Sequence, residues 1–217
     1  MSVMYGYHVY PDQKITTRLS LAVSLMDDYT GKQPISGVKV FLKEKDEDLK
    51  GKEIKSVKNR SGYYLFLDLP MEEYRVQVEA EHYFEEDIPV KLSDLDPLNP
   101  VVQVKLKPSP SYPFPSGTTL IRGMVSDIDK NPVAGAKVEV PEKNVINITT
   151  EKGEFVLYFK GLTEDNIKKE GGKRFVKVNS NTTVSLEAAW NSKKGSSDLE
   201  KVEEGQTTVL EEPIALK

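Results

Sequence analysis

Two stretches of the chain repeat one pattern of turn and core residues. QPISGVKVFL fills residues 33–42 and NPVAGAKVEV fills residues 131–140, so Pro, Gly, Lys and Val recur at the same spacing 98 residues apart. A Pro-x-x-Gly turn followed by an alternating stretch is typical of a turn that leads into a strand. Because 217 residues suffice for two domains of roughly 100 residues, the repeat predicts two copies of one small β domain.

Apolar and polar residues alternate in the strands that come before this repeat in each half. The residues predicted to face the two cores there are Leu19, Leu21, Val23 and Leu25 in the first half, and Ile121, Gly123 and Val125 in the second. Turn residues divide such stretches at intervals of roughly 8–12 residues, a pattern that predicts an all-β sandwich. The best helix candidate is residues 162–172, a short segment with Thr163 as an N-cap and Gly171 as a stop.

A proline-rich stretch separates the two halves. KPSPSYPFPSG, residues 107–117, contains four prolines, which fix φ and remove backbone donors. We therefore expect an extended, semi-rigid spacer that joins no sheet interior. The predicted domains are a sandwich with an N-terminal extension in 1–107, a linker in 108–117, and a second sandwich in 118–217.

Three further segments match between the halves in the same order. They are 59–64 and 150–155, which share a polar turn, a glycine and an aromatic residue, 78–80 and 186–188, and 104–106 and 214–216. When the first repeat is included, the four matching segments of the second half lie 98, 91, 108 and 110 residues after their counterparts in the first half. The jump from 91 to 108 predicts an insertion of about 17 residues in the second half, within 161–181. Matching residues 175–178 to 74–78 instead would move the insertion without removing it.

The predicted insertion has strand character. Residues 175–178 read FVKV and residues 179–181 read NSN, which is a good turn, so the segment is compatible with a hairpin. A long connection in a compact domain is uncommon unless it is functional or disordered. We expect the insertion to supply more of a partner surface than the corresponding loop of the first half. The alternative is a hairpin that merely extends the sheet.

The second half resembles a known family. Its order of Gly123-x-Val125-x-Asp127, Pro132-x-x-Gly135 and Thr150-x-x-Gly153-x-Phe155 is similar to that of the carboxypeptidase regulatory-like domains, which have a transthyretin-like (prealbumin-like) β-sandwich. The first half resembles the family more loosely, with His82-Tyr83 where the family usually has Gly-Tyr. The resemblance implies two Ig-like or transthyretin-like Greek-key β-sandwiches in tandem. Its motifs are turn and core positions, so they specify fold far more than function.

Composition excludes several classes of function. The net charge is −4, with 15 basic and 18 acidic residues in 1–107 and 15 and 16 in 118–217, so neither half has the basic footprint of a nucleic-acid-binding protein. There is no cysteine, hence no disulfide framework. The start of the chain has no signal-peptide pattern, and no apolar stretch is long enough to span a membrane. We expect a cytoplasmic protein, or part of an assembly that is exported without a signal peptide.

The titratable residues suggest no catalytic, cofactor or metal site. His82-x-x-Glu85 has the spacing of a zinc-binding pair, but His8 is the only other histidine, and a catalytic zinc needs three protein ligands. The chain has no Gly-x-Ser-x-Gly nucleophile motif and no glycine-rich phosphate loop. We therefore expect a protein that is not an enzyme and that holds no metal or cofactor.

Aromatic residues are the remaining candidates for binding, because exposed rings stack on sugars or fill partner pockets. The candidate contacts are Tyr5, Tyr7, Tyr10, Phe175 and Trp190. Packing in a strand or a core is the alternative for each. The sequence favours a non-catalytic structural or interaction protein, a tandem scaffold or docking module of a larger assembly that binds another protein. The alternative is a protein that binds carbohydrate or another ligand through exposed aromatic residues.

Overall fold

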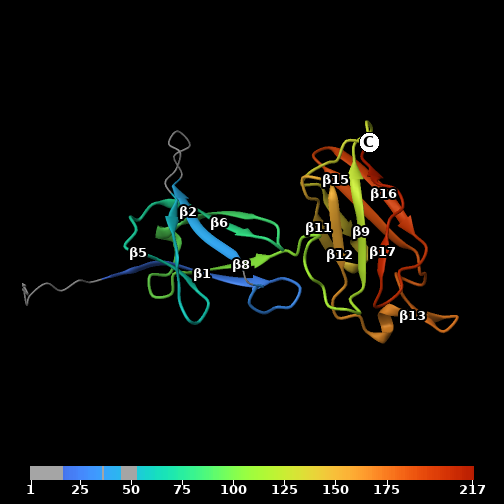
Figure 1. The fold of residues 1–217 in the computed structure, drawn as a ribbon, viewed down its shortest axis with the longest axis horizontal. Helices are drawn as coiled ribbons and strands as arrows, with labels where there is room; N and C mark the ends of the chain where they lie inside the picture. Colours follow the sequence, from blue (N-terminus) through green and yellow to red (C-terminus); the bar gives the residue numbers. More distant parts are fainter. Residues whose placement is uncertain (1–16, 36, 45–52) are drawn as a thin grey trace, which may run out of the picture.

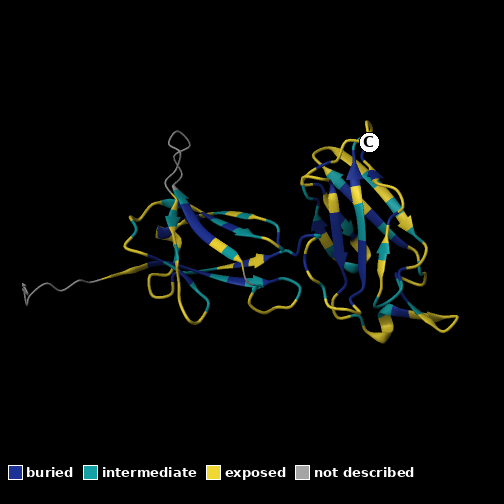
Figure 2. Ribbon diagram, viewed as in Figure 1, coloured by how far each residue is buried: buried dark blue, intermediate teal, exposed yellow. Residues whose placement is uncertain are grey.

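The protein is all-β and forms two β-sandwiches, each around its own buried core (Figures 1 and 2). The computed structural model describes residues 17–35, 37–44 and 53–217. Strands of the first sandwich run along the length of the molecule in Figure 1, and strands of the second run across it. The end of the first sandwich therefore meets the side of the second.

The first sandwich has two four-stranded sheets. One has the order β4-β5-β1-β8, and these strands are Val57–Lys58, Tyr64–Leu67, Leu19–Asp27 and Val101–Leu106. The other has the order β3-β2-β6-β7, and these strands are Ile54–Lys55, Val38–Glu44, Glu73–Ala80 and Glu86–Lys91. A short 3-10 helix, η1, covers Leu92–Asp94. The first and last strands, β1 and β8, pair in parallel, whereas the other pairs are antiparallel.

The second sandwich repeats this arrangement. One sheet has the order β12-β9-β17, with β18 also on β9, and these strands are Glu154–Tyr158, Leu120–Ser126, Thr207–Val209 and Ile214–Ala215. The other has the order β11-β10-β15-β16, and these strands are Val145–Ile148, Lys137–Val140, Val184–Trp190 and Lys193–Leu199. A 3-10 helix, η2 (Pro141–Lys143), joins β10 to β11. Each half is thus a β-sandwich of two sheets.

The repeated Pro-x-x-Gly pattern occupies the same place in both sandwiches. Gly37 (φ 92°) and Gly135 (φ 68°) both adopt the left-handed region just before β2 and β10, where glycine carries no steric penalty. Val40 and Val138 then face the two cores, at 4% and 0% exposure. They pair with Val78 and Ala188, respectively.

This pairing corrects one detail of the predicted alignment. If Val40 and Val138 are equivalent, then Val78 corresponds to Ala188, an offset of 110. The sequence match of residues 78–80 with 186–188 is therefore displaced by two residues. A shift of two keeps every side chain on its predicted face, because the strand period is two, so the error is invisible in the hydrophobic pattern.

The alternation in the first strand holds with one exception. Leu21, Val23 and Leu25 lie in the first core, whereas Leu19 is 39% exposed. The register of β1 against β5 shifts between Leu19 and Leu21, and such a bulge redirects the strand before it enters the sandwich.

The segment between β12 and β15 forms a hairpin. Thr163 caps a 3-10 turn, η3 (Glu164–Asn166), and then β13 (Ile167–Glu170) pairs with β14 (Lys173–Val176) across a Gly171-Gly172 turn. The helix predicted for 162–172 is thus only this single turn, because Gly171 and Gly172 both have positive φ and close a hairpin instead. The hairpin projects from the second sandwich on the side away from the first (Figure 1).

The proline-rich stretch differs from the extended spacer that the prolines predict. It turns at residues 109–112, where the Tyr112 N–H donates to the Ser109 carbonyl at 3.0 Å. Tyr112 is 5% exposed and belongs to the first core. The prolines restrict the backbone but leave the aromatic side chains between them free to pack, and their burial folds the stretch onto the first sandwich.

A glycine pair tests the turn geometry of the second sandwich. Gly135 and Gly153 have similar positive φ (68° and 73°), but a Cβ on Gly135 meets nothing within 4 Å, whereas one on Gly153 would lie 2.6 Å from the Val125 carbonyl oxygen. We expect Gly135→Ala to cost about 1–2 kcal/mol of stability from backbone conformation alone. Gly153→Ala should cost about 1–3 kcal/mol more, because the backbone must also shift.

Urea unfolding followed by the fluorescence of Trp190, the only tryptophan, measures the second sandwich specifically. Equal destabilisation by the two substitutions would contradict the close approach at Gly153.

Candidate functional site

The turn that ends β1 is built around a buried carboxylate. Asp27 is 1% exposed, and its Oδ1 accepts the N–H groups of Tyr29 (2.7 Å) and Thr30 (3.1 Å). Its Oδ2 accepts the hydroxyl groups of Tyr83 (3.0 Å) and Tyr112 (2.6 Å). A buried carboxylate is costly unless it is fully hydrogen-bonded, and these four donors satisfy both oxygens.

This carboxylate holds three separate segments together. Tyr83 follows β6, Tyr112 lies in the proline-rich stretch, and Asp27 ends β1. The Tyr83 hydroxyl also accepts the N–H of Ile35 at 3.0 Å, which ties in the loop before β2. Asp27 thereby fastens the proline-rich stretch to the first sandwich.

Burial and the neighbouring carboxylate both favour the neutral form of these tyrosines. Burial, followed by the Asp27 carboxylate, raises the pKa of Tyr83 to about 12 even though the Ile35 N–H acts in the opposite direction. The pKa of Tyr112 is raised for the same two reasons, burial first. Both hydroxyl groups therefore stay protonated, and able to donate to Asp27, throughout the neutral range.

The second sandwich has a similar but shorter aspartate turn after β9, without the tyrosines. Asp127 Oδ1 accepts the N–H groups of Asp129 (2.9 Å) and Asn131 (2.8 Å), and its Oδ2 accepts the Asn131 amide at 3.2 Å. These hydrogen bonds, first that from the Asn131 backbone, lower the pKa of Asp127. Both sandwiches thus have an aspartate-capped turn after their first strand, and among the described residues only Asp27 also binds tyrosines.

A row of aromatic rings leads from Asp27 to the second sandwich. Tyr112 packs against Tyr83 (centroids 5.5 Å apart) and Phe114 (4.7 Å). Tyr29 and Phe114 then lie 5.6 and 5.5 Å from the ring of Tyr158, on β12. Two of these four pairs, Tyr29 with Tyr158 and Tyr83 with Tyr112, are edge-to-face, an arrangement that the ring quadrupoles favour, and the other two are tilted.

The second sandwich offers an apolar patch to these rings. Leu120 on β9 and Val156 and Tyr158 on β12 are 5%, 0% and 5% exposed, yet they form a cluster apart from the second core. Tyr29 and Phe114 pack against this cluster. One end of the outer face of this sheet is therefore covered by the first sandwich and the proline-rich stretch, and we call this contact the junction.

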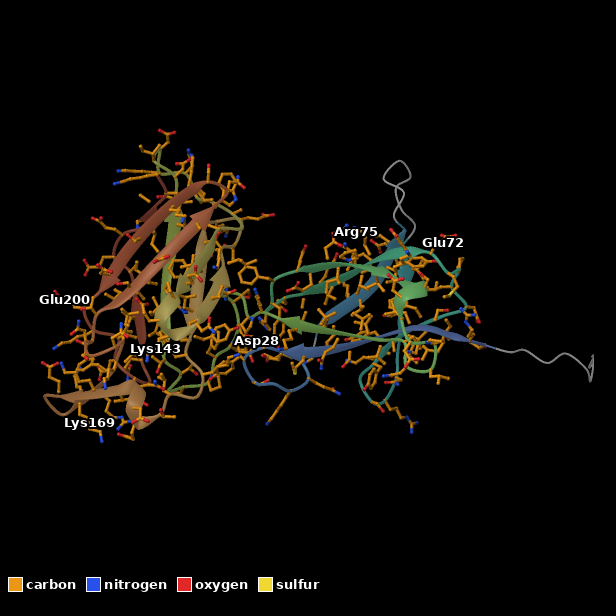
Figure 3. The ribbon with its side chains drawn as sticks, turned by 180° about the vertical axis from the view of Figure 1, so that it is seen from behind. Asp28, Glu72, Arg75, Lys143, Lys169 and Glu200 are labelled. Carbon is orange, nitrogen blue, oxygen red and sulfur yellow. The ribbon has the colours of Figure 1, made fainter. Side chains whose placement is uncertain are left out.

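A carboxylate at the edge of the junction binds two groups of the second sandwich. Asp28, seen between the sandwiches in Figure 3, accepts the Tyr158 hydroxyl (2.8 Å) and the Lys160 ammonium (3.0 Å) through Oδ2, and its carbonyl oxygen accepts Lys160 at 2.7 Å. Burial acts to raise the pKa of Asp28, but these hydrogen bonds and the charge of Lys160 outweigh it and lower the pKa. Burial, then Asp28, raises the pKa of Tyr158.

Two side chains of the second sandwich hold the proline-rich stretch by its carbonyl groups. Asn147, which is fully buried on β11, donates to the carbonyl oxygens of Pro108 and Val156, both at 2.9 Å. Arg122 on β9 donates to the carbonyl oxygen of Pro110 at 2.7 Å. Proline residues lack N–H groups but keep their carbonyl acceptors, so a proline-rich stretch suits this kind of attachment.

Two of the five aromatic residues predicted as binding contacts, Trp190 and Phe175, lie within the described residues. Trp190, at the end of β15, is 40% exposed, whereas Phe175 on β14 is 7% exposed, and the Lys201 ammonium lies 5.2 Å from its ring centre. Little of the Phe175 ring is therefore open to a ligand. Tyr5, Tyr7 and Tyr10 lie outside the described residues.

His82 has no metal-binding surroundings among the described residues. His82 follows β6, and its Nδ1 is buried without a hydrogen-bond partner, while His8 lies outside the described residues. In 17–35, 37–44 and 53–217, no three His, Cys, Asp or Glu side chains gather closely enough to hold a metal ion. Nor does any helix in these ranges have the length and apolar character needed to cross a membrane.

A groove of about 480 Å³ lies beside the junction, on the outer face of the β12-β9-β17 sheet. Its lining includes Arg122, Met124, Glu154, Val209 and Pro110. Met124 and Val209 are 42% and 62% exposed. The groove and the junction thus occupy two ends of the same sheet face.

Comparisons with known proteins give only distant similarity. No protein-family profile and no curated protein matches the chain. Among solved structures, the Bacillus anthracis TIE protein is 13% identical with a TM-score of 0.28, over 90% of this chain and 34% of its own. A Streptococcal ancillary pilin is 13% identical with a TM-score of 0.28, over 93% of this chain and 62% of its own. This chain thus spans less than two thirds of either protein.

A third solved structure is CBMbc of family CBM26 from Eubacterium rectale, in complex with maltoheptaose. It is 13% identical with a TM-score of 0.23, over 88% of this chain and 90% of its own. Because all three TM-scores are low, the case for a function depends on this chain's own residues.

The high pKa of Tyr83 gives a direct test of the Asp27 cluster. At about pH 11, an ordinary tyrosine is mostly ionised but Tyr83 is not. Wild type and Tyr83→Phe should therefore show the same near-ultraviolet phenolate absorbance when folded. In urea, where all ten tyrosines ionise, the variant should show one phenolate fewer. A lower absorbance of the folded variant would mean that Tyr83 titrates normally and contradict the cluster.

The same shift sets an alkaline limit on stability. The pKa of Tyr83 in the folded protein lies above the ordinary tyrosine value of 10. The contribution of Tyr83 to the free energy of unfolding is therefore fully present below about pH 10 and is lost as pH rises toward about 12. We expect urea midpoints to fall across this window, and to fall less steeply in Tyr83→Phe. If the urea midpoints of wild type and Tyr83→Phe fall equally steeply with pH, the loss of stability at alkaline pH comes from other groups.

Proposed function

We propose that the chain is a non-catalytic structural or interaction module of a larger assembly. In this proposal two transthyretin-like sandwiches of the carboxypeptidase regulatory-like type, 1–107 and 118–217, are held in one orientation through residues 108–117. The module would fix the distance and angle between whatever binds at its two ends. The observation that carries the proposal is the junction, where the connecting stretch is fastened to both sandwiches.

The number of contacts across the junction supports a fixed orientation. Domains within one chain move relative to each other by default unless their interface is substantial and apolar. Here two ring pairs reach Tyr158, each worth about 0.5–1.5 kcal/mol beyond burial. Asp28, Asn147 and Arg122 add hydrogen bonds, each worth about 0.5–1.5 kcal/mol net. Their sum is several times RT, so one orientation should dominate.

Spin-label distances test this orientation. The chain has no cysteine, so Ser93→Cys and Ser196→Cys place one exposed label on each sandwich. We expect one narrow distance distribution in otherwise wild-type protein. Tyr29→Ala with Phe114→Ala removes the rings that contact Tyr158 and should broaden the distribution. Leu98→Ala, which truncates a side chain that is 93% exposed, should leave it unchanged.

Two results would contradict the proposal. A broad distribution in the wild-type background would show that the sandwiches move independently. A distribution that stays narrow in the double alanine variant would show that the aromatic rings do not set the orientation. Circular dichroism of each variant confirms that both sandwiches remain folded.

Carbohydrate or ligand binding is a second candidate, supported by Trp190. This ring is 40% exposed at the end of β15, and exposed indole rings stack on sugars. Titration with a panel of neutral oligosaccharides should then change the Trp190 fluorescence, and Trp190→Ala should abolish binding measured by calorimetry. Unchanged fluorescence across the panel would count against this candidate.

A further inference from the structure

Three lysines on or near the hairpin of the second sandwich lack acidic partners among the described residues. Several cations there are paired, since Lys169 lies 3.0 Å from Glu164, Lys173 lies 2.7 Å from Glu203 and Lys201 lies 3.3 Å from Glu170. Lys143, Lys168 and Lys177 have no ion pair or side-chain hydrogen bond with any described residue. In Figure 3, Lys143 and Lys169 lie at the same end of the second sandwich.

Two of these lysines repel each other. Lys143 ends η2 and Lys177 follows β14, and both side chains are partly buried. Burial, then the positive charge of Lys177, lowers the pKa of Lys143, and no carboxylate opposes the shift. An uncompensated pair of like charges is unfavourable, and a bound anion would relieve it.

The same end of the sandwich has an open groove. A groove of about 470 Å³ is lined by Glu164, Ile167, Lys168, Lys169, Lys177 and Ser180. Glu164 is already engaged by Lys169 and Arg174, whose hydrogen bonds and charges lower its pKa. The groove therefore offers an excess of positive charge and a hydroxyl group to a ligand.

An unpaired strand edge borders this groove. The other edge of the hairpin is occupied, because the Val176 N–H donates to Val202 and the Glu204 N–H donates to Arg174. β13 pairs with β14 alone among the described strands, so its outer edge is open. Hydrogen-bonded and non-hydrogen-bonded residue pairs alternate along an antiparallel pair of strands. Because the Lys177 N–H donates to the Asn166 carbonyl, the pair of Lys169 with Arg174 is not hydrogen-bonded. The backbone N–H and C=O groups of Lys169 therefore point to the open edge.

We propose that this surface binds an extended acidic segment of a partner protein, which adds as a strand to β13 and places its carboxylates near Lys143, Lys168 and Lys177. Strand addition supplies main-chain hydrogen bonds, and the lysines select acidic side chains. Lysines on an edge strand also discourage pairing with uncharged or basic strands, so the same residues exclude other partners. The proposal rests on the proposed function as a docking module and names the chemistry of its partner.

A synthetic peptide of alternating Glu and Val, labelled for fluorescence anisotropy, is the probe. It should bind the full-length protein at low salt, and its affinity should fall as salt rises. Lys143→Gln with Lys177→Gln should weaken binding about fivefold, as expected for two surface ion pairs. Lys193→Gln with Lys194→Gln, on β16, makes the same change of charge away from the groove and should leave affinity unchanged.

Two further measurements separate strand addition from charge attraction alone and from a structural role of the lysines. A peptide with N-methyl groups on alternate residues keeps its charges but cannot complete the strand pairing, so it should bind much more weakly. The melting temperature of Lys143→Gln with Lys177→Gln should not fall, because this variant removes a repulsion. A fall would assign the lysines a structural role instead and overturn the proposal.

Absence of peptide binding would overturn the proposal, as would equal loss of affinity in the β16 control. If the N-methylated peptide binds as tightly as the unmodified peptide, or if polygalacturonate binds more tightly than the peptide, the surface recognises a polyanion without strand addition. Either result would also overturn the proposal. None of these outcomes affects the spin-label distances, so a failure here is distinguishable from a failure of the rigid junction.

Discussion

The buried carboxylate of Asp27 is the interaction on which the junction depends. It ends the first strand, caps the following turn and accepts two tyrosine hydroxyl groups, one of which belongs to the proline-rich stretch. Tyr112, held in this way, packs against Phe114, which in turn contacts the ring of Tyr158. The attachment of the second sandwich thus begins inside the first, and the charge that holds it is satisfied by four donors.

Each sandwich has an aspartate-capped turn after its first strand, but the two aspartates make different contacts. In the second, Asp127 binds only its own turn, whereas in the first Asp27 also binds Tyr83 and Tyr112. Conversely, the second sandwich carries the hairpin of β13 and β14, where the first has only a short connection between β5 and β6. The two sandwiches therefore differ: the first holds the connection between them, and the second carries a projecting charged surface.

The sequence predicts the local architecture well because its signals are local. Gly37 and Gly135 mark turns by their spacing, and alternation places Val40 and Val138 in the cores. The junction is not predicted because its contacts join residues far apart, such as Tyr158 and Asp28, which are separated by 130 positions. Prolines suggest a spacer, yet the alternation of Tyr112 and Phe114 with those prolines is a usable signal for burial. The open edge of β13 depends on tertiary pairing, which periodicity does not contain.

Residual dipolar couplings test the central claim, that the two sandwiches form one rigid body, most directly. Backbone N–H couplings of the weakly aligned protein give an alignment tensor for each sandwich separately. A rigid junction predicts tensors of equal magnitude and common orientation when they are fitted to the structure. Tensors of clearly different magnitude for the two sandwiches would show independent motion and contradict the account.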